Sequence, residues 1–378
     1  MLTSPHSEGS VDPRQVNDAG PATDATAPSR DVRYSIMVIS GLLALGLGVG
    51  AAALPVPYVV ESAGPVFNTL GKDGDKPVIS VTGHESFPAK GDLDLTTVVT
   101  TGGPQSPATI LDVFRGWLDP SKAVYPEELI YPKGSTAQDT AKQGQVDMAT
   151  SQENAVAAAL RQLKIPFEQR LTVAGLSDSS PSAGKIQESD RLVSINGKPV
   201  TSLAAIQAEL GAGAGAPAVV VVDRGGKSVT ATITPTKNPS GTYILGVLLA
   251  SGFTFPFNVN ISLNNVGGPS AGMMFALGII DTLTPGDLTG GKHIAGTGTI
   301  TPDGAVGAIG GIAQKMIGAK QQGATLFLAP AANCGDVVGH IPNGLQVVKV
   351  ETLAEATAAV KQFASGGDVK GLPTCTNN

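Results

Sequence analysis

The sequence has few cysteines and no concentration of basic residues. Its two cysteines, Cys334 and Cys375, have no Cys or His neighbour at the spacing of metal ligands, so the sequence predicts no metal site. The formal net charge is -6 over 378 residues, and the Lys and Arg residues are scattered along the chain. Nucleic-acid binding needs a basic patch, and we therefore exclude nucleic acid as a partner.

Glycine, in contrast, is abundant. The chain contains 48 glycines, most of them in short turns, which is well above the average share of about 7%. A fold with many tight turns is therefore expected. The length is sufficient for about two domains of roughly 100–200 residues each, with tails.

The N-terminal part divides into a polar tail and an apolar segment. The first 33 residues are rich in Pro, Ser, Asp and Ala and have no sustained apolar face, which predicts disorder. Ser35 to Leu54 carry no charged residue, and a helix of about 20 apolar residues spans a hydrocarbon core of about 30 Å. The sequence therefore predicts a transmembrane helix over 34–54.

Charges around this segment predict its orientation. Arg30 and Arg33 precede it, whereas the next charge after it is Glu61. The positive-inside rule then places the N-terminus in the cytoplasm and the rest of the chain outside. A cleaved signal peptide, with Ala51–Ala53 as its cleavage site, is the alternative, which the long leader and long apolar run disfavour.

Three segments follow before the middle of the chain. The alternation from Lys76 to Gly103 predicts two strands paired through a turn at Pro88–Gly91. Ser106 to Asp119 predicts a helix, with its first residue as the N-cap and Pro107 in the first turn. Ser135 to Leu163 predicts one long or broken helix.

The segment from Arg170 to Thr236 has a different pattern. It predicts a strand, a loop, a helix at about Ser202 to Leu210, and two strands joined across Gly225 and Gly226. The dipeptide Asn196-Gly197 supplies the positive φ of a tight hairpin. This segment therefore predicts a small β-rich domain with one helix.

Within it, the stretch Ser180 to Val200 resembles the PDZ domain in its bacterial protease-associated form. PDZ domains bind an extended peptide by adding it as a strand to a sheet edge, often capturing its terminal carboxylate on backbone N–H groups. The resemblance implies a peptide-binding loop near Ala174, Gly175 and Leu176. A small β domain used only for packing is the alternative.

From Gly241 onward, strands and helices alternate, which predicts an α/β or α+β fold. The stretch "NNVGGPSAGMMFALGIID", Asn264 to Asp281, places Ser270 at the start of a helix with almost no polar side. Ser270 is either the N-cap of that helix or a nucleophile. In the second case the backbone N–H groups around Gly268, Ser270 and Ala271 form an oxyanion hole.

Lys315 is a candidate base for this serine. A lysine deprotonates a serine only when it is neutral, and burial in an apolar site lowers its pKa from about 10.4. The alternative is an ammonium that reaches solvent from the edge of an amphipathic helix. His84, His293 and His340 stay open as candidates for a Ser-His-Asp triad.

One segment imitates a nucleotide-binding loop. "GDLTGGKH", Gly286 to His293, satisfies GxxxxGK, but a P-loop needs Ser or Thr at the last position and a helix after it. His293 fails the first test, and the following "IAGTGTI" predicts a strand. The sequence therefore predicts no ATP binding and no cofactor.

Three separated motifs, "GGPSAG", "GTGTIT" and "GGIAQK", resemble the proteolytic domain of Lon proteases over about Asn258 to Glu351. The resemblance implies that Ser270 is the nucleophile, Lys315 the general base, and Thr297 a residue that hydrogen-bonds the lysine. The sequence departs from ATP-dependent Lon proteases in lacking an ATPase module. Gly267 also stands where those enzymes often have an acidic residue, which leaves acidic control of the site in doubt.

The whole layout is similar to membrane-anchored, PDZ-containing Lon-like serine proteases of bacteria. This resemblance implies an α+β fold of the ribosomal-protein-S5-domain-2-like type with an inserted PDZ domain and an N-terminal transmembrane helix. The expected parts are a tail at 1–33, the transmembrane helix at 34–54, the first part of the Lon-like domain at 59–163, the PDZ domain at 165–237, the Lon-like catalytic domain at 238–363, and a C-terminal tail at 364–378.

The expected function is ATP-independent cleavage of unfolded or exposed extracytoplasmic proteins by a Ser-Lys dyad. A membrane-tethered peptide-binding scaffold with an inactive Lon-like domain is the alternative. Lon-like domains tend to form rings, which suggests a hexamer or a trimer. In an extracytoplasmic compartment a disulfide between Cys334 and Cys375 is expected to tie the C-terminal tail to the domain, with two free thiols as the alternative.

Overall fold

The computed structural model describes residues 30–264, 266–366 and 369–376. The chain forms two compact units, Met1–Leu54 and Pro55–Asn378. Helix α1 (Arg30–Ala52) is the first described element. Within the described part of the chain, one helical segment, Asp31–Ala52 of α1, is long and apolar enough to cross a membrane. The helix begins four residues earlier than predicted, so 30–33 are helical. The rest of the predicted disordered tail, 1–29, lies outside the described residues.

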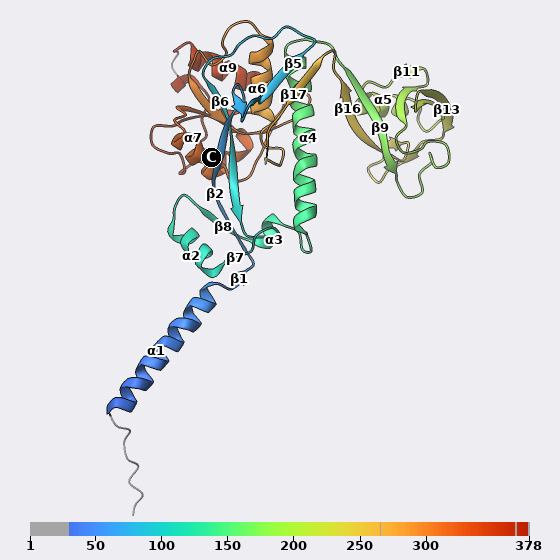
Figure 1. The fold of residues 1–378 in the computed structure, drawn as a ribbon. Coiled ribbons are helices and arrows are strands. Elements are labelled where there is room, and N and C mark those ends of the chain that lie inside the picture. Colours follow the sequence, from blue (N-terminus) through green and yellow to red (C-terminus); the bar gives the residue numbers. More distant parts are fainter. Residues whose placement is uncertain (1–29, 265, 367–368, 377–378) are drawn as a thin grey trace, which may run out of the picture. The chain divides into compact units, whose positions relative to one another are not determined.

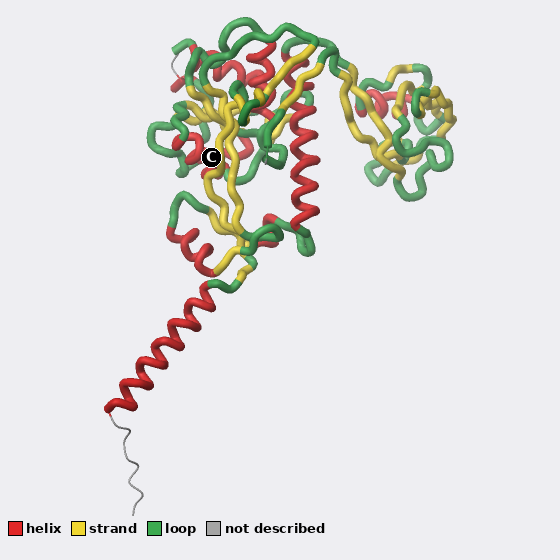
Figure 2. Tube along the Cα trace, in the orientation of Figure 1, coloured by secondary structure: helices red, strands yellow, loops and turns green. Residues whose placement is uncertain are grey.

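The second unit is built on a six-stranded mixed sheet (Figures 1 and 2). Its strands, in spatial order, are β22 (Gln346–Val350), β21 (Leu326–Pro330), β18 (His293–Gly296), β6 (Asp92–Thr101), β2 (Tyr58–Asn68) and β8 (Ala123–Pro126). The first four are parallel, and β2 and β8 pair antiparallel at one edge. The parallel strands are buried, as parallel sheets covered on both faces usually are.

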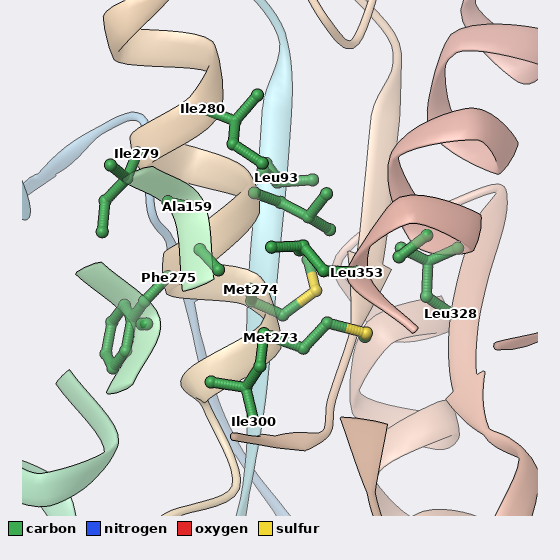
Figure 3. Packing of buried hydrophobic residues seen from close by; sticks show 14 of the residues in the cluster. Leu93, Ala159, Met273, Met274, Phe275, Ile279, Ile280, Ile300, Leu328 and Leu353 are labelled. Atoms are coloured by element: carbon green, nitrogen blue, oxygen red, sulfur yellow. The ribbon is translucent and has the colours of Figure 1, made fainter. Parts of the chain in front are cut away.

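Helices cover both faces of this sheet. Helix α6 (Gly272–Leu283) packs against α4 (Ala137–Gln162) and α9 (Leu353–Ala364), whereas α7 (Ile312–Gln321) packs against β2 and β6. Side chains alternate along the strands as the period of two requires. Ile294 joins the core around α6, as does Leu328 (Figure 3), whereas Ala295 and Phe327 join the core around α7. Helices α6 and α7 therefore lie on opposite faces of the sheet.

A second sheet forms what we call the β9–β16 module. Its strands are β9 (Glu168–Leu176), β10 (Arg191–Ile195), β11 (Lys198–Pro199), β12 (Ala218–Arg224), β13 (Lys227–Ile233) and β16 (Val247–Thr254), and its helix is α5 (Leu203–Ala212). These elements surround a core of their own. Ser202 caps α5, and Asn196 and Gly197 have φ of 49° and 76°, so the predicted helix and tight turn are confirmed.

The predicted boundary of the PDZ domain at residue 237 is wrong. Strand β16 lies beyond that boundary, yet it pairs along β9 from Leu176↔Val247 to Glu168↔Thr254. The sheet therefore needs β16 to cover one edge of β9, and the module extends to at least Thr254. The sequence alone did not show this because pairing between strands so far apart depends on the tertiary fold.

Two local predictions also need correction. The strands of the region 76–103, β5 (Ile79–Thr82) and β6, are not paired with each other. Strand β5 pairs with β17 (Asn258–Ile261), and β6 pairs with β2 and, over 92–95, with β18. Helix α2 (Ile110–Leu118) starts later than predicted. Thr109 is its N-cap and forms a capping box with Asp112, which satisfies the free helical amides better than Ser106 can.

Other predictions of single elements are confirmed. Helix α4 is one continuous helix capped by Thr136, within two residues of the predicted start. The remaining described elements are β1 (Pro55–Val56), β3 (Lys72–Asp73), β4 (Lys76–Pro77), β7 (Ala108–Thr109), α3 (Glu127–Ile130), β14 (Thr236–Lys237), β15 (Tyr243–Ile244), β19 (Thr299–Ile300), β20 (Val306–Gly307), η1 (Ala331–Asn333), α8 (Cys334–Val337) and η2 (Val369–Gly371).

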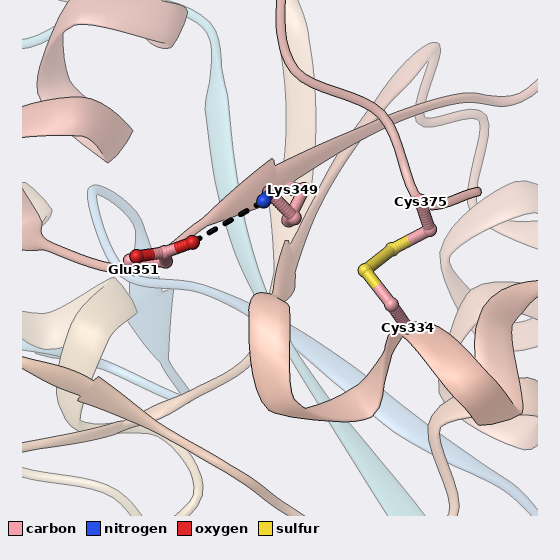
Figure 4. The surroundings of a disulfide bond; sticks show 4 residues. All are labelled: Cys334, Lys349, Glu351 and Cys375. Carbon is pink, nitrogen blue, oxygen red and sulfur yellow. Dashed lines mark hydrogen bonds and ion pairs between the residues drawn. A yellow bond between two sulfur atoms is a disulfide. The ribbon is translucent and has the colours of Figure 1, made fainter. Parts of the chain in front are cut away.

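The C-terminal segment returns to the sheet and is held there covalently. Cys375 forms a disulfide with Cys334, at the start of α8 (Figure 4). The amide of Lys349 on β22 donates a hydrogen bond to the carbonyl of Pro373, at 2.8 Å. The disulfide and this hydrogen bond fix the C-terminal segment beside the last strand of the main sheet.

Candidate active site

The loop that carries Ser270 is supported by α4. The amide of Gly268 donates to the carbonyl of Gly144 at 2.9 Å, and Ser151 Oγ donates to the carbonyl of Pro269 at 2.9 Å. Gly268 has φ of +87°, a conformation that glycine adopts readily. Helix α4 thus fixes the course of the chain immediately before Ser270.

Ser270 is not the N-cap of α6. The helix begins at Gly272 with Ala271 as its N-cap, and no side chain caps it. Ser270 and Pro269 therefore precede the helix, two and three residues before its first residue. The hydroxyl of Ser270 instead faces Lys315, which separates the two alternatives that the sequence left open.

Helix α7 places Lys315 within hydrogen-bond distance of Ser270. Lys315 is only 3% exposed, and its neighbours Ile312, Met316 and Ala319 on α7 are buried as well. Its Nζ donates hydrogen bonds to Ser270 Oγ at 3.0 Å and to Thr297 Oγ1 at 3.2 Å. The alternative in which this ammonium reaches solvent is therefore wrong.

Thr297 joins the serine and the lysine. It is the first residue after β18, and its Oγ1 donates to the carbonyl of Ser270 at 3.0 Å while accepting from Lys315. Strand β18 ends at Gly296, whereas its neighbours β6 and β21 continue to Thr101 and Pro330. Because α6 and α7 lie on opposite faces of the sheet, the loop that precedes α6 and Lys315 of α7 meet where β18 ends.

Burial sets the charge of the lysine. Burial lowers the pKa of Lys315 to about 8, and the nearby carboxylate of Glu61 opposes this change. Glu61 lies on β2, is 8% exposed, and has a pKa that burial raises and Lys315 lowers. A substantial fraction of Lys315 is therefore neutral near pH 8, which is the form that accepts a proton.

The predicted oxyanion amides are only partly available. The amide of Gly268 already donates to Gly144, so Gly268 is not a free donor in this conformation, and that part of the prediction is wrong. The amides of Ser270 and Ala271 have no acceptor among the described residues. These two N–H groups belong to the turn that carries the half-buried Ser270, just before α6, where free helical N–H groups can bind a negative charge.

A pocket of about 220 Å³ opens onto the serine and the lysine. Apolar residues from four parts of the chain line it, including Pro65 on β2, Leu95 on β6, Met148 on α4 and Val266 before α6. The Thr96 and Thr97 segment of β6 also lines the pocket. The pocket therefore places apolar side chains and part of strand β6 beside Ser270 and Lys315.

The histidines lie elsewhere in the described chain. His293 Nε2 is 2.6 Å from Asp94 Oδ2, and this pair joins the neighbouring strands β18 and β6. The hydroxyl of Ser270 is bonded to Lys315 and not to a histidine. The segment 286–293 continues into β18 as predicted and opens no helix, and no group of metal-ligating residues occurs within the described ranges.

The predicted peptide-binding residues are not in a loop. Ala174, Gly175 and Leu176 form the end of β9, where Gly175 and Leu176 pair with β16. That edge of β9 is filled by the chain itself, so a peptide cannot be added there. These residues therefore belong to a strand and not to a loop, and peptide binding by them at another edge stays a prediction.

Three supporting residues were not found from the sequence. Glu61 was interpreted only as the first charge after the apolar segment, yet it lies beside the lysine. Ser151 and Gly144 hold the serine loop from the middle of α4. A single charged residue inside the apolar strand "YVVESAG" was the one signal for Glu61; nothing marked the other two.

Residues 265–362 match the family model of the Lon protease (S16) C-terminal proteolytic domain. The chain therefore carries a serine protease domain of the Lon type, and Ser270, Thr297 and Lys315 lie within it. Among curated proteins, Lon protease of Roseiflexus castenholzii is 43% identical over 70 residues, or 18% of this chain and 8% of that protein.

Two further relatives match longer segments. Lon protease 2 of Herpetosiphon aurantiacus is 39% identical over 124 residues, 29% of this chain and 15% of that protein. Lon protease 2 of Bacillus subtilis is 34% identical over 119 residues, 30% of this chain and 20% of that protein. The matches thus span a fifth or less of the length of these relatives.

Two solved structures are also similar. The PDZ domain of an SdrC-like protein from Listeria innocua has 21% identity and a TM-score of 0.20, covering 21% of this chain and 92% of that chain. The corresponding domain from Listeria monocytogenes has 22% identity and a TM-score of 0.20, covering 21% of this chain and 85% of that chain. The PDZ assignment of the β9–β16 module stays a prediction.

Proposed function

We propose that this protein is a membrane-anchored, ATP-independent serine endopeptidase that uses Ser270 as nucleophile and Lys315 as general base. The observation that carries this proposal is the distance of 3.0 Å between Lys315 Nζ and Ser270 Oγ, at a lysine that is 3% exposed. A buried amine within hydrogen-bond reach of a hydroxyl is the arrangement that activates a serine.

In the first step the neutral amine of Lys315 takes the proton from Ser270 Oγ. The oxygen attacks the peptide carbonyl carbon, and the carbonyl oxygen becomes an oxyanion that accepts hydrogen bonds from the amides of Ser270 and Ala271. Each such donor is worth roughly 10²–10³ in rate. Thr297 keeps Lys315 in place through the bond of 3.2 Å between its Oγ1 and Nζ.

The lysine then returns the proton to the leaving nitrogen. The C–N bond breaks, the new amine leaves, and an acyl ester of Ser270 stays behind. Lys315 next deprotonates a water molecule, which attacks the ester and releases a carboxylic acid while the proton returns to Ser270 Oγ. All proton transfers thus use one base that starts and ends neutral.

The proposed location follows from α1. Its length and composition suit a membrane span, and the arginines at its start suit a cytoplasmic N-terminus. We place the Lon-type domain outside the cytoplasm, where its disulfide is stable. The intact mass of the membrane-extracted protein separates this anchor from a cleaved leader, which would remove α1.

Substrates are expected to be unfolded or exposed protein segments. ATP independence rests on the sequence, in which the one GxxxxGK segment continues into a strand. The β9–β16 module is proposed to bind peptide ends as PDZ domains do, although not at the edge of β9 that β16 fills. Because Lon-like domains tend to form rings, we expect a hexamer or a trimer. The mass of the protein complex in detergent tests this expectation.

The test is cleavage of an unfolded protein by the full chain in detergent, without nucleotide and with added ATP and Mg²⁺. We expect equal cleavage in both conditions and its loss in Ser270→Ala and in Lys315→Ala. A fluorophosphonate serine probe should label the wild type but not Ser270→Ala. Binding of peptide without cleavage would instead support the scaffold alternative and contradict the proposal.

A further inference from the structure

Helix α2 exposes an unusual amount of apolar surface. Five of its residues are large, apolar and between 41% and 68% exposed: Ile110, Leu111, Phe114, Trp117 and Leu118. At 100° per residue these five lie on one continuous arc of about 120°. An exposed apolar patch of this kind usually marks an interaction site.

This arc is not the side by which α2 packs on its own domain. The inward side carries Val113 and Gly116, which are buried, and a Cβ added at Gly116 would lie 2.7 Å from Val124 Cγ2 on β8. Asp112 and Arg115 occupy the polar remainder of the helix. On the exposed arc, Trp117 contacts the ring of Tyr58 edge to face, with ring centroids 6.2 Å apart, yet Trp117 is still 65% exposed. Most of the arc surface therefore stays open to the surroundings.

The start of α2 is tied to the point where the chain leaves α1. Strand β1 pairs with β7, so that Pro55 is opposite Thr109, the N-cap of α2. Pro55 is three residues beyond Ala52, where α1 ends. Three residues span at most about 10 Å and paired strands are about 5 Å apart, so α2 begins within roughly 15 Å of that end.

The composition of the arc suits a lipid surface. Trp117 is the only tryptophan in the chain, and tryptophan is enriched where a bilayer meets water, because its ring is apolar and its N–H is polar. Amphipathic helices with Trp, Phe and Leu on one side lie in that interface. A helix of nine residues is about 13 Å long, short enough to lie flat beside the membrane span.

We propose that α2 lies in the outer interface of the bilayer that α1 enters, with its exposed arc in contact with lipid. This inference rests on the proposed membrane anchor. A second copy of the chain is the other class of occupant. It does not explain why α2 begins at a residue that pairs with Pro55, only three residues after the membrane span ends. Such contact would hold β2 and β8, against which α2 packs, close to the membrane.

The experiment uses the full chain in phosphatidylcholine vesicles and the fluorescence of Trp117. Bromine on lipid acyl chains quenches only a tryptophan that contacts lipid, and iodide in the buffer quenches only one that contacts water. We expect the chain to float with the vesicles and brominated lipid to remove roughly half of the emission or more. Iodide should have little effect.

Two variants sharpen the result. Phe114→Glu combined with Leu118→Glu keeps the tryptophan and changes residues that are 54% and 68% exposed, so we expect lipid quenching to fall at least about twofold because charge disfavours interfacial burial. The matched control, Leu203→Glu, changes a residue on α5 that is 52% exposed, and should leave lipid quenching unchanged.

Each contrary outcome has a distinct meaning. A chain that fails to float contradicts the membrane anchor itself. A chain that floats while iodide, and not bromine, quenches Trp117 overturns the inference alone. A floating chain in which neither quencher acts shows that protein covers the arc, as a second copy would, and this also overturns the inference.

Discussion

Two buried ionisable side chains lie in opposite surroundings in the two sheet regions of this protein. In the β9–β16 module, Asp190 accepts two hydrogen bonds from Arg224 at 2.7 Å and one from the amide of Gln187 at 2.8 Å. Its hydrogen bonds with Arg224 hold the pKa of Asp190 below its usual range. Among the described residues, the Nζ of Lys315 bonds only the hydroxyls of Ser270 and Thr297, and burial lowers the pKa of Lys315 to about 8.

This difference separates a structural charge from a reactive group. A buried charge that is fully paired stays ionised and is chemically inert. A buried amine without a carboxylate in hydrogen-bond contact loses its proton near neutral pH, and it is then a base. The surroundings of Lys315 therefore fit catalysis, and those of Asp190 fit the stability of the module.

Removing the base should have the largest effect. We expect Lys315→Ala to lower peptide cleavage by about 10³-fold or more, because Lys315 is the basic side chain that bonds Ser270 Oγ in the described part of the chain. Lys320→Ala is the matched control, since Lys320 is on the same helix but bonds the carbonyl of Gly344. Near-normal cleavage by Lys315→Ala, measured on an unfolded protein, would contradict the distinction between the two charges.

Breaking the structural pair should affect stability instead. Arg224→Met leaves the Asp190 carboxylate, whose side chain is 1% exposed, without its charged partner, and should therefore lower the free energy of unfolding. Denaturant unfolding should show this loss in the module. Cleavage of a short peptide by the dyad should stay within about threefold of the wild type. If Arg224→Met lost as much cleavage as Lys315→Ala, the distinction between the structural charge of Asp190 and the reactive Lys315 would be wrong.

The pH dependence of cleavage tests the charge of the base directly. Lys315 must be neutral to act, so the rate should rise with pH and reach half its maximum near pH 8. Glu61→Gln removes the carboxylate that raises the pKa of Lys315, so the midpoint should move to lower pH. Glu128→Gln, at an exposed carboxylate on α3, should leave it unchanged. An unmoved midpoint in Glu61→Gln would show that Glu61 does not influence the lysine.

The smallest effect on cleavage is expected at His293. It pairs with Asp94, and we interpret this as a second structural pair, although burial raises the pKa of Asp94, whereas hydrogen bonds with Arg224 lower that of Asp190. His293→Gln should keep cleavage within about threefold of the wild type while lowering stability by about 1 kcal/mol. A loss comparable to that of Ser270→Ala would instead make His293 part of the reaction.

Local elements were predicted well where local chemistry fixes them. Thr136 caps α4 close to the predicted start, and Asn196-Gly197 forms the predicted turn, because capping and positive φ depend on neighbouring residues. Errors arose where the result depends on partners distant in sequence. The pairing of β5 with β17 and of β16 with β9 joins segments that no local pattern connects.

The sequence by itself predicted the apolar helix and the alternation of strands and helices, and three motifs pointed to Ser270, Thr297 and Lys315 as candidate site residues. Only the tertiary structure decided that Lys315 is buried, that Ser270 faces it and is not the cap of α6, and that Gly268 is already bonded. The physical reason is that the pKa and reach of a lysine depend on burial and neighbours. Burial and neighbours are set by the tertiary fold, in which α6 and α7 pack on opposite faces of one sheet and strand β18 ends at Gly296, beside the site.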